Sequence, residues 1–457
     1  MSALLPAHAM DRPQRIGSQR LSAAAATLET LRPVALRGQV KEVSGLLLRI
    51  EGLAPWLQVG SRVTLASARG PIRAEVVSFS AGLAEAMAFG PLEGVGPGTM
   101  ATLMATEGLA VGPGWLGRVV DPLGQPMDGL GPLPPGGLVL PVRAPPPNAG
   151  TRARLGPRLD LGVRALDAFA TCRRGQRLGL FAASGVGKST LLSMLAKGAE
   201  CDVCVLALVG ERGRELREFI EDDLGAEGMA RSVVVCATSD STPLMRREAA
   251  YAALTVAEYF ASQGKHVLLL MDTVTRFAMA LREIGLAAGE PPATRGYTPS
   301  VFAELPRLLE RAGPREEGNP GAITGLFTVL VEGDDHDEPV ADAVRGILDG
   351  HVVLDRHIGE RGRYPAIDVL RSLSRTVPGC LQPEEAALMR RARAILALQA
   401  EMADLVRLGA YRAGTDAAVD EALRLAPGIE AFLAQRKDER GTVDSAFAAL
   451  AEAMEDG

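Results

Sequence analysis

The feature that most limits the possible folds is a regular alternation of continuous apolar runs with amphipathic segments between residues 176 and 287. Runs that are apolar throughout are typical of strands buried on both faces, as in a parallel sheet with helices on each side. The predicted strands are QRLGLFAA, CVLALVG, SVVVCATS and HVLLLMD, and the helical patterns between and after them include KSTLLSMLAKG, RELREFIEDDLG, LMRREAAYAALTVAEYFASQG and RFAMALREIGLA. The alternation predicts an α/β domain that binds ligands at the carboxyl ends of its strands.

Different patterns flank this domain. From residue 31 to about 103, short apolar runs separated by glycine-bearing turns predict a small β-barrel or sandwich. The Pro/Gly-rich stretch 131–150 forbids regular helix and predicts a connection or a covering segment. Beyond about Thr376 the strands stop, and two helices are predicted, EEAALMRRARAILALQAEMADLVRLGAY and DAAVDEALRLAPGIEAFLAQ. We therefore divide the chain into a tail (1–20), a β-barrel domain (21–103), an α/β domain (104–376) and a helical C-terminal domain (377–457).

Composition excludes several classes of protein. Hydrophobic residues make up 47% of the 457 positions, enough for a sizeable core, and a net charge of −6 with 4% aromatic residues argues against a nucleic-acid partner. Five scattered cysteines fit a reducing compartment. No apolar run approaches the roughly 18 residues of a membrane span, and the first residues lack the pattern of a signal peptide. We expect a cytoplasmic protein.

The segment FAASGVGKST, residues 181–190, nearly fits the phosphate-loop pattern G-x-x-x-x-G-K-[ST], with Ala182 in place of the first glycine. It joins a predicted strand to a predicted helix, which is the context that such a loop requires. In this reading Lys188 reaches the β and γ phosphates and the Ser189 hydroxyl ligates Mg²⁺. The expected nucleotide-binding residues are Ala183, Ser184, Gly185, Val186, Gly187, Lys188, Ser189 and Thr190. The alternative is a plain strand-to-helix turn.

Two carboxylates end predicted strands and are expected at the same edge of the sheet. Asp272 ends HVLLLMD, where a carboxylate can hold Mg²⁺ directly or through water; the alternative is a helix-capping aspartate. Glu211 closes CVLALVG and is our candidate for the group that orients the attacking water. From the residues alone, Glu211 could equally be a solvated loop residue paired with Arg212 or Arg214.

Several longer segments together resemble a known family. PAIDVLRSLS, residues 365–374, fits the signature P-[SAP]-[LIV]-[DNH]-x-x-x-S-x-S of the rotary ATP synthase catalytic subunits. LGRVVDPLGQPMDG is a second marker of that family, and EPPATRGYTPSVFAELPRLLERAG and TVLVEGDDHDEPVADAVRGILDGHVVLDR resemble the ATPases of type III protein export. IGERGRYPAIDVLRSLSR is most similar to the flagellum-specific branch.

The resemblance implies a RecA-like P-loop domain with a parallel sheet, preceded by a β-barrel and followed by helices. It implies Mg²⁺-dependent ATP hydrolysis by a homohexameric ring, with each nucleotide between neighbouring chains. Glu211 then corresponds to the catalytic carboxylate and Arg375 to an arginine finger that enters the neighbour's site. Tyr364 matches the aromatic residue that stacks on adenine; without the family it could equally be a core tyrosine. Arg212 is expected to contact the phosphates or to hold Glu211.

One residue and one segment depart from the family pattern. Ala183 replaces a frequent glycine, and TVPGC after Arg375 is unusual, which leaves the packing behind the finger open.

The resemblance also implies partners. These are chaperone–substrate complexes, membrane proteins of an export gate, a central stalk-like protein, and a regulatory stalk-like protein at the tail, with the ring held peripherally at the inner membrane. Arg12, Arg15 and Arg20 could favour anionic lipid. The alternatives are a proton-driven ATP synthase subunit, a hexameric RNA translocase and a non-catalytic nucleotide-binding subunit. Whether a flagellum or an injection apparatus is served stays open.

Overall fold

The computed structural model describes residues 35–104, 108–135, 137–331 and 338–455. Contacts divide the chain into two compact units, one built from residues up to 87 together with 92–105, and the other from 88–91 together with 106–457. The predicted tail, with its three arginines, lies outside the described residues. The domain boundaries at residues 103 and 376 stay predictions.

The first unit is a closed barrel, as predicted. Its strands alternate inward and outward side chains, so that Val40, Leu48, Ile50, Val63 and Leu65 fill the interior. Among the described residues, closure pairs every strand of the barrel on both sides and leaves no exposed sheet edge in it. Within the described residues, the strands follow the order β1-β2-β5-β4-β3-β6 and are β1 (Arg37–Ser44), β2 (Leu47–Glu51), β3 (Arg62–Ser67), β4 (Gly70–Ser80), β5 (Leu83–Ala88) and β6 (Met100–Leu103).

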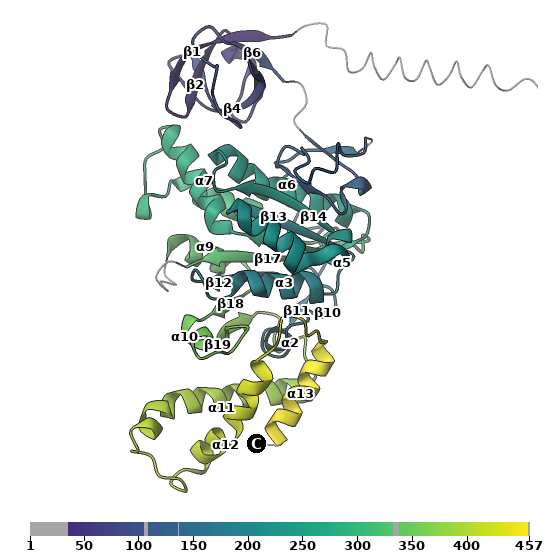
Figure 1. Cartoon of the computed structure of the whole chain (residues 1–457), viewed down its shortest axis with the longest axis vertical. Helices are drawn as coiled ribbons and strands as arrows, with labels where there is room; N and C mark the ends of the chain where they lie inside the picture. Colours follow the sequence, from purple (N-terminus) through teal and green to yellow (C-terminus); the bar gives the residue numbers. More distant parts are fainter. Residues whose placement is uncertain (1–34, 105–107, 136, 332–337, 456–457) are drawn as a thin grey trace, which may run out of the picture. The chain divides into compact units, whose positions relative to one another are not determined.

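The second unit contains the predicted parallel sheet (Figure 1). Its strand order is β19-β18-β12-β17-β15-β13-β14-β8, and the pairs from β18 to β8 are all parallel, while β19 runs antiparallel to β18. The strands are β8 (Val119–Val120), β12 (Arg177–Ala182), β13 (Val203–Glu211), β14 (Ser232–Thr238), β15 (His266–Asp272), β17 (Ala322–Leu330), β18 (Gly350–Leu354) and β19 (Ile367–Ser374), and β16 (Gly313–Pro314) pairs with β17. Two short ribbons pair β7 (Leu109–Val111) with β9 (Leu138–Leu140) and β10 (Arg158–Leu159) with β11 (Cys172–Arg173).

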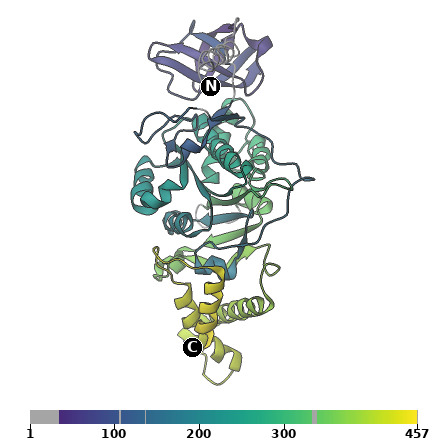
Figure 2. The same ribbon diagram turned by 90° about the vertical axis from the view of Figure 1, so that its right-hand side faces the viewer.

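Helices cover both faces of this sheet because its strands are apolar on both faces. Leu206 and Leu270 point into one core, with α3 and the C-terminal helices, while Val205 and Leu269 point into the other, with α6 to α9. The helices are α2 (Arg164–Phe169), α3 (Lys188–Gly198), α4 (Gly213–Glu218), α5 (Gly225–Ala230), α6 (Pro243–Ser262), α7 (Val274–Ala287), α8 (Pro299–Leu309), α9 (Pro339–Ile347), α10 (Arg356–Glu360), α11 (Pro383–Arg407), α12 (Ala417–Leu433) and α13 (Val443–Glu455). The C-terminal helices, yellow-green to yellow in Figures 1 and 2, pack beside α2 and the end of β19.

Two elements differ from the sequence-based expectations. RELREFIEDDLG was predicted as one helix, but α4 passes into a π-helical turn, Phe219–Leu224, before α5 begins at Gly225, where φ is +65°. Helix α13 was not predicted; it buries Phe447 and Leu450 against the C-terminal helices. Among the described helices, none is long and apolar enough to cross a bilayer.

Candidate active site

The phosphate-loop segment connects β12 to α3, as its sequence predicts. Ala182 is the last residue of β12 and pairs with both β17 and β18, so the position needs no glycine because it is ordinary extended backbone. Gly185 and Gly187 have φ of +81° and +95°, a region that favours glycine. The loop lines a cavity of about 390 Å³ together with the first turns after β13 and β15.

Lys188 brings two carboxylates together at the carboxyl edge of the sheet. Its Nζ lies 2.6 Å from Asp272 Oδ1 and 3.5 Å from Glu211 Oε1. The Thr328 hydroxyl donates a second hydrogen bond of 2.6 Å to Asp272 Oδ1. All of these groups project from the ends of neighbouring parallel strands or from the start of α3, which is why residues about 140 positions apart meet there.

Glu211 is held away from the neighbouring arginines. A bulge at Gly210, with φ of +72°, shifts the register of β13 immediately before Glu211. Burial raises the pKa of the Glu211 carboxyl above its usual value; Lys188 opposes this shift, and the charge of Asp272 adds to it. Arg212 and Arg214 instead form ion pairs with glutamates of the following turn, Glu215 and Glu218. The alternative in which Glu211 pairs with either arginine is therefore not the arrangement found.

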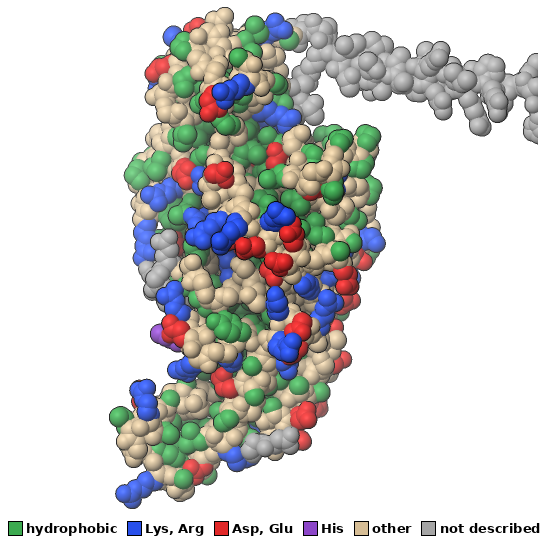
Figure 3. All heavy atoms as spheres, viewed as in Figure 1, with side chains coloured by type: hydrophobic (Ala, Val, Ile, Leu, Met, Phe, Trp, Pro, Cys, Tyr) green, Lys and Arg blue, Asp and Glu red, His purple; other side chains and the backbone are tan. Residues whose placement is uncertain are grey.

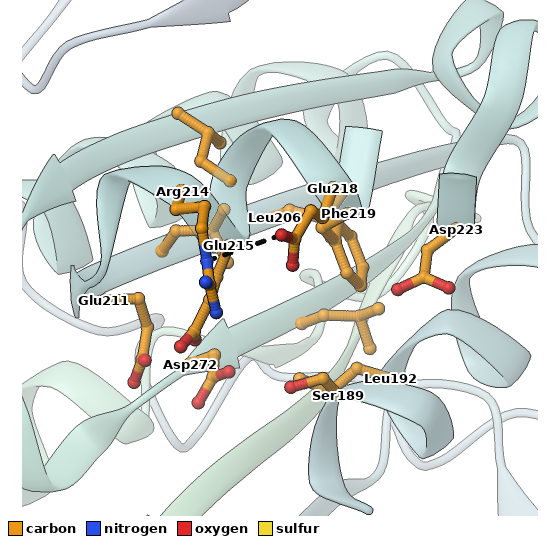
Figure 4. Close-up of a pocket in the computed structure, with 13 residues that line it drawn as sticks. Ser189, Leu192, Leu206, Glu211, Arg214, Glu215, Glu218, Phe219, Asp223 and Asp272 are labelled. Carbon is orange, nitrogen blue, oxygen red and sulfur yellow. Dashed lines mark ion pairs between the residues drawn. The ribbon is translucent and has the colours of Figure 1, made fainter. Parts of the chain in front are cut away.

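A second cavity of about 280 Å³ lies beside these carboxylates (Figure 4). Leucines of α3, β13 and β15 and Phe219 of the π-helical turn form its apolar wall. Figure 4 shows the Asp272 carboxylate between Glu211 and Ser189, so that two carboxylates and a hydroxyl face the same space. The site combines an apolar interior with a polar edge, which strengthens electrostatic interactions at that edge.

The donors present fit Mg²⁺. Ser189 and Asp272 offer hard oxygen atoms, which this ion prefers, and it commonly uses only one or two carboxylates together with substrate phosphates. Over the described ranges, no group of three or more His, Cys, Asp or Glu residues could hold a metal without a substrate. The position of Lys188 Nζ against Asp272 also indicates that a positive charge is stable there.

Tyr364 lies next to the phosphate loop. A Cβ atom added at Gly187 would be 3.5 Å from the Tyr364 ring, and Tyr364 as a residue is 47% exposed. The Tyr364 carbonyl oxygen accepts a hydrogen bond of 2.8 Å from the backbone N–H of Gln435. Tyr364 lines an open cavity of about 690 Å³ with Thr190, Met194 and residues 434–439. A flat group attached to a phosphate on the loop can therefore stack on the exposed ring.

Arg375 lies at the amino ends of the parallel strands, opposite the ends that carry the phosphate loop. Because β19 runs antiparallel to β18, Ser374 pairs with Gly350 at the start of β18, and the Arg375 backbone N–H donates to the Asp349 carbonyl at 2.9 Å. Asp349 is level with Arg177 at the start of β12, six residues before the loop, which corresponds to roughly 20 Å along the strand. The exposed Arg375 side chain is therefore not brought to the phosphate loop of its own chain.

Two arginines near the loop were missed by the sequence analysis. Arg276, in the first turn of α7, lines the loop cavity, and its charge lowers the pKa of Glu211 in opposition to burial. Its buried Nε has no hydrogen-bond partner among the described residues. Arg356 donates a hydrogen bond of 3.3 Å to the Ser184 carbonyl. The spacing of Arg276, one helical turn after the strand-ending Asp272, is the signal that could have identified it.

Comparisons with known proteins agree along nearly the whole chain. Residues 162–374 match the model of the ATP synthase alpha/beta family nucleotide-binding domain, and residues 381–452 match that of the T3SS EscN ATPase C-terminal domain. The flagellum-specific ATP synthase of Caulobacter vibrioides is 55% identical over 94% of this chain and 98% of its own length. The type 3 secretion system ATPase of Xanthomonas euvesicatoria is 47% identical over 92% of this chain and 94% of its own.

A solved structure gives the same result. The assembled ATPase EscN of the enteropathogenic E. coli type III secretion system, in complex with its central stalk EscO, superposes with a TM-score of 0.83 at 37% identity. The match covers 91% of this chain and 100% of the EscN chain.

Proposed function

Because this chain belongs to the ATP synthase alpha/beta family and is an ATPase of its flagellar and type III secretion branch, we propose that it hydrolyses ATP in a homohexameric ring. In this proposal, hydrolysis drives type III protein export. One observation carries the proposal. Lys188, Glu211 and Asp272 converge on the phosphate loop, while Arg375 projects from the opposite edge of the same sheet. A complete site therefore requires a second chain.

Each residue has a distinct task in the proposed reaction. Lys188 leaves its carboxylate partners for the β and γ phosphates, and the loop amides of residues 183–190 bind the phosphate oxygens. Glu211 holds and orients the attacking water. Tyr364 stacks on adenine. We propose that Arg212 and Arg276 neutralise phosphate charge, because both line the same cavity.

Ser189 and Asp272 are the residues proposed to hold Mg²⁺. When bound, the ion neutralises charge on the β and γ phosphate oxygens. The buried Asp272 carboxylate is held in place because the Thr328 hydroxyl donates a hydrogen bond to the same oxygen that faces Lys188.

Arg375 is proposed to act as an arginine finger in the neighbouring chain's site. Such a cation can contribute roughly 10³ to 10⁵ in rate, and it acts only when the neighbour is docked. Hydrolysis then depends on ring assembly, and the assembled state of the related EscN supports this view.

The proposed partners follow the relatives. The EscN complex contains a central stalk, and we propose a stalk-like protein for this chain as well. We further propose that hydrolysis releases export substrates from chaperones at a membrane gate, and that the protein is cytoplasmic and peripheral to the inner membrane. The 55% identity to a flagellum-specific relative favours a flagellar system over an injection apparatus.

The test of the proposal is Arg375→Ala. The variant should assemble into rings and bind ATP like the wild type, yet its hydrolysis rate per ring should fall about 10³-fold or more. A ring that hydrolyses ATP at the wild-type rate without this arginine would contradict the shared site.

The two enzymatic alternatives are separable by experiment. An ATP synthase subunit would co-purify with a membrane rotor, and an RNA translocase would require RNA for turnover. On the face in Figure 3, Lys and Arg side chains are interspersed with Asp and Glu side chains, which is unlike the basic stripe of a nucleic-acid channel.

A further inference from the structure

Gln176, the residue before β12, is a fully buried polar side chain whose hydrogen bonds are all used. Its Nε2 donates to the Asp349 carbonyl at 3.2 Å and to Ser374 Oγ at 2.9 Å. Its Oε1 accepts from the Arg173 backbone N–H at 2.9 Å and from Thr376 Oγ1 at 3.2 Å. A primary amide offers two N–H donors and two acceptor lone pairs, so the side chain is saturated.

Three of these four bonds converge on the residues around Arg375. Ser374 and Thr376 are its two neighbours in the chain, and the Asp349 carbonyl that accepts from Gln176 also accepts the Arg375 backbone N–H at 2.9 Å. Gln176 thus binds segments that lie 173 to 200 positions away in the sequence. No local interaction can supply this restraint, because the three segments meet only in the folded sheet.

The surroundings strengthen the restraint on the backbone, whereas the Arg375 guanidinium has no short hydrogen bond to the described residues. The Ser374 hydroxyl donates to the Thr171 carbonyl at 2.9 Å, and the single Thr376 hydroxyl proton is shared between that carbonyl, at 3.3 Å, and Gln176 Oε1, at 3.2 Å. In contrast, the Arg375 guanidinium is exposed and reaches the Arg345 carbonyl only at 3.5 Å, too long to hold it. The position of the guanidinium is therefore set mainly by the backbone that carries it.

We infer that Gln176 is a positioning residue for the arginine finger. It fixes the backbone on both sides of Arg375, so that the guanidinium meets the neighbouring chain's site in one place. This inference rests on the proposed action of Arg375 in that site. It also accounts for the packing behind the finger, where the sequence TVPGC departs from the family pattern, since Thr376 supplies one of the four bonds.

The first experiment is Gln176→Met, which keeps the length and volume of the side chain and removes all four hydrogen bonds. A displacement of about 1 Å at a reacting group can reduce a rate about 10²-fold, so kcat per assembled ring should fall about 10- to 100-fold. The KM for ATP should change less than about threefold, because the phosphate loop and Tyr364 are untouched. The control is Thr255→Val, which removes a buried hydroxyl of α6 that bonds Tyr251 and Arg311 and not the residues around Arg375, and it should leave kcat and KM unchanged.

The second experiment asks in which chain Gln176 acts. Chains with Glu211→Gln have a silent site but an intact finger, so mixing them with Gln176→Met chains should create working interfaces and raise the activity well above that of either variant alone. Arg375→Ala chains mixed in the same way are the reference. If Gln176→Met does not assemble, Thr376→Val removes one bond and should show a smaller loss that the same mixing restores.

The outcomes separate the two claims. Restoration in both mixtures supports the inference. Restoration with Arg375→Ala but not with Gln176→Met would overturn the inference, since the defect would then lie in the variant's own site. A Gln176→Met ring with normal kcat would overturn it as well. Failure of the Arg375→Ala mixture would overturn the shared site itself, and this inference with it.

Discussion

The pairing of Lys188 with Asp272 can be tested by a double-mutant cycle on the nucleotide-free protein. The two charged atoms are 2.6 Å apart, and the side chains are 17% and 8% exposed. At an effective dielectric constant of about 20, the Coulomb energy at this distance is about 6 kcal/mol before desolvation is subtracted. Stranding one member of such a buried pair typically costs about 3 to 5 kcal/mol, so Lys188→Met should destabilise the protein by about 3 kcal/mol.

The test depends on whether the second substitution lowers or raises the free energy of unfolding. Asp272→Asn should destabilise the wild type, because the ammonium keeps only its longer contact of 3.5 Å with Glu211. In the Lys188→Met background the same substitution should be neutral or stabilising, because it removes a stranded carboxylate. Urea unfolding of all four proteins should give a coupling free energy of at least about 2 kcal/mol. The matched control is the exposed pair Arg217–Glu221, at 2.7 Å, which should show no measurable coupling. Additive effects at Lys188 and Asp272 would refute the reasoning.

Two further predictions concern pH. Because burial raises the pKa of Glu211 above the ordinary 4.5, kcat/KM should fall with decreasing pH, beginning at a pH above 4.5. Glu211→Gln should keep ATP binding while losing about 10²- to 10⁴-fold in turnover. A pH–rate profile that is flat down to pH 4.5 would contradict this role. Burial raises the pKa of Asp167 from 3.8 to about 8, so the folded state binds a proton more tightly and stability must decrease as pH rises between these values. Relative to Asp167→Asn, the wild type should therefore lose about 2 kcal/mol of unfolding free energy between pH 6 and 8, and parallel curves for the two proteins would show that this carboxyl is not responsible.

Local patterns were sufficient to predict the elements of the candidate site. The strand before the loop, the loop itself and α3 are contiguous, and the apolar runs that end at Glu211 and Asp272 identify themselves without knowledge of their neighbours. Parallel strands have their carboxyl ends on one edge, so the approach of these two side chains to Lys188 followed from the pattern. The mistaken single helix over RELREFIEDDLG shows the limit of periodicity, since a π-helical turn changes the spacing by only one residue.

The sequence alone therefore determined the class of fold, the phosphate loop and the carboxylates around it, because each depends on residues that are neighbours in the chain or on a rule shared by all parallel sheets. Only the tertiary structure decided where Arg375 lies and what holds it. The direction of β19 is set by its pairing with β18, and the bonds of Gln176 join segments up to 200 positions apart. Such pairings form through burial and hydrogen bonding between distant parts of the chain, and no local pattern encodes them.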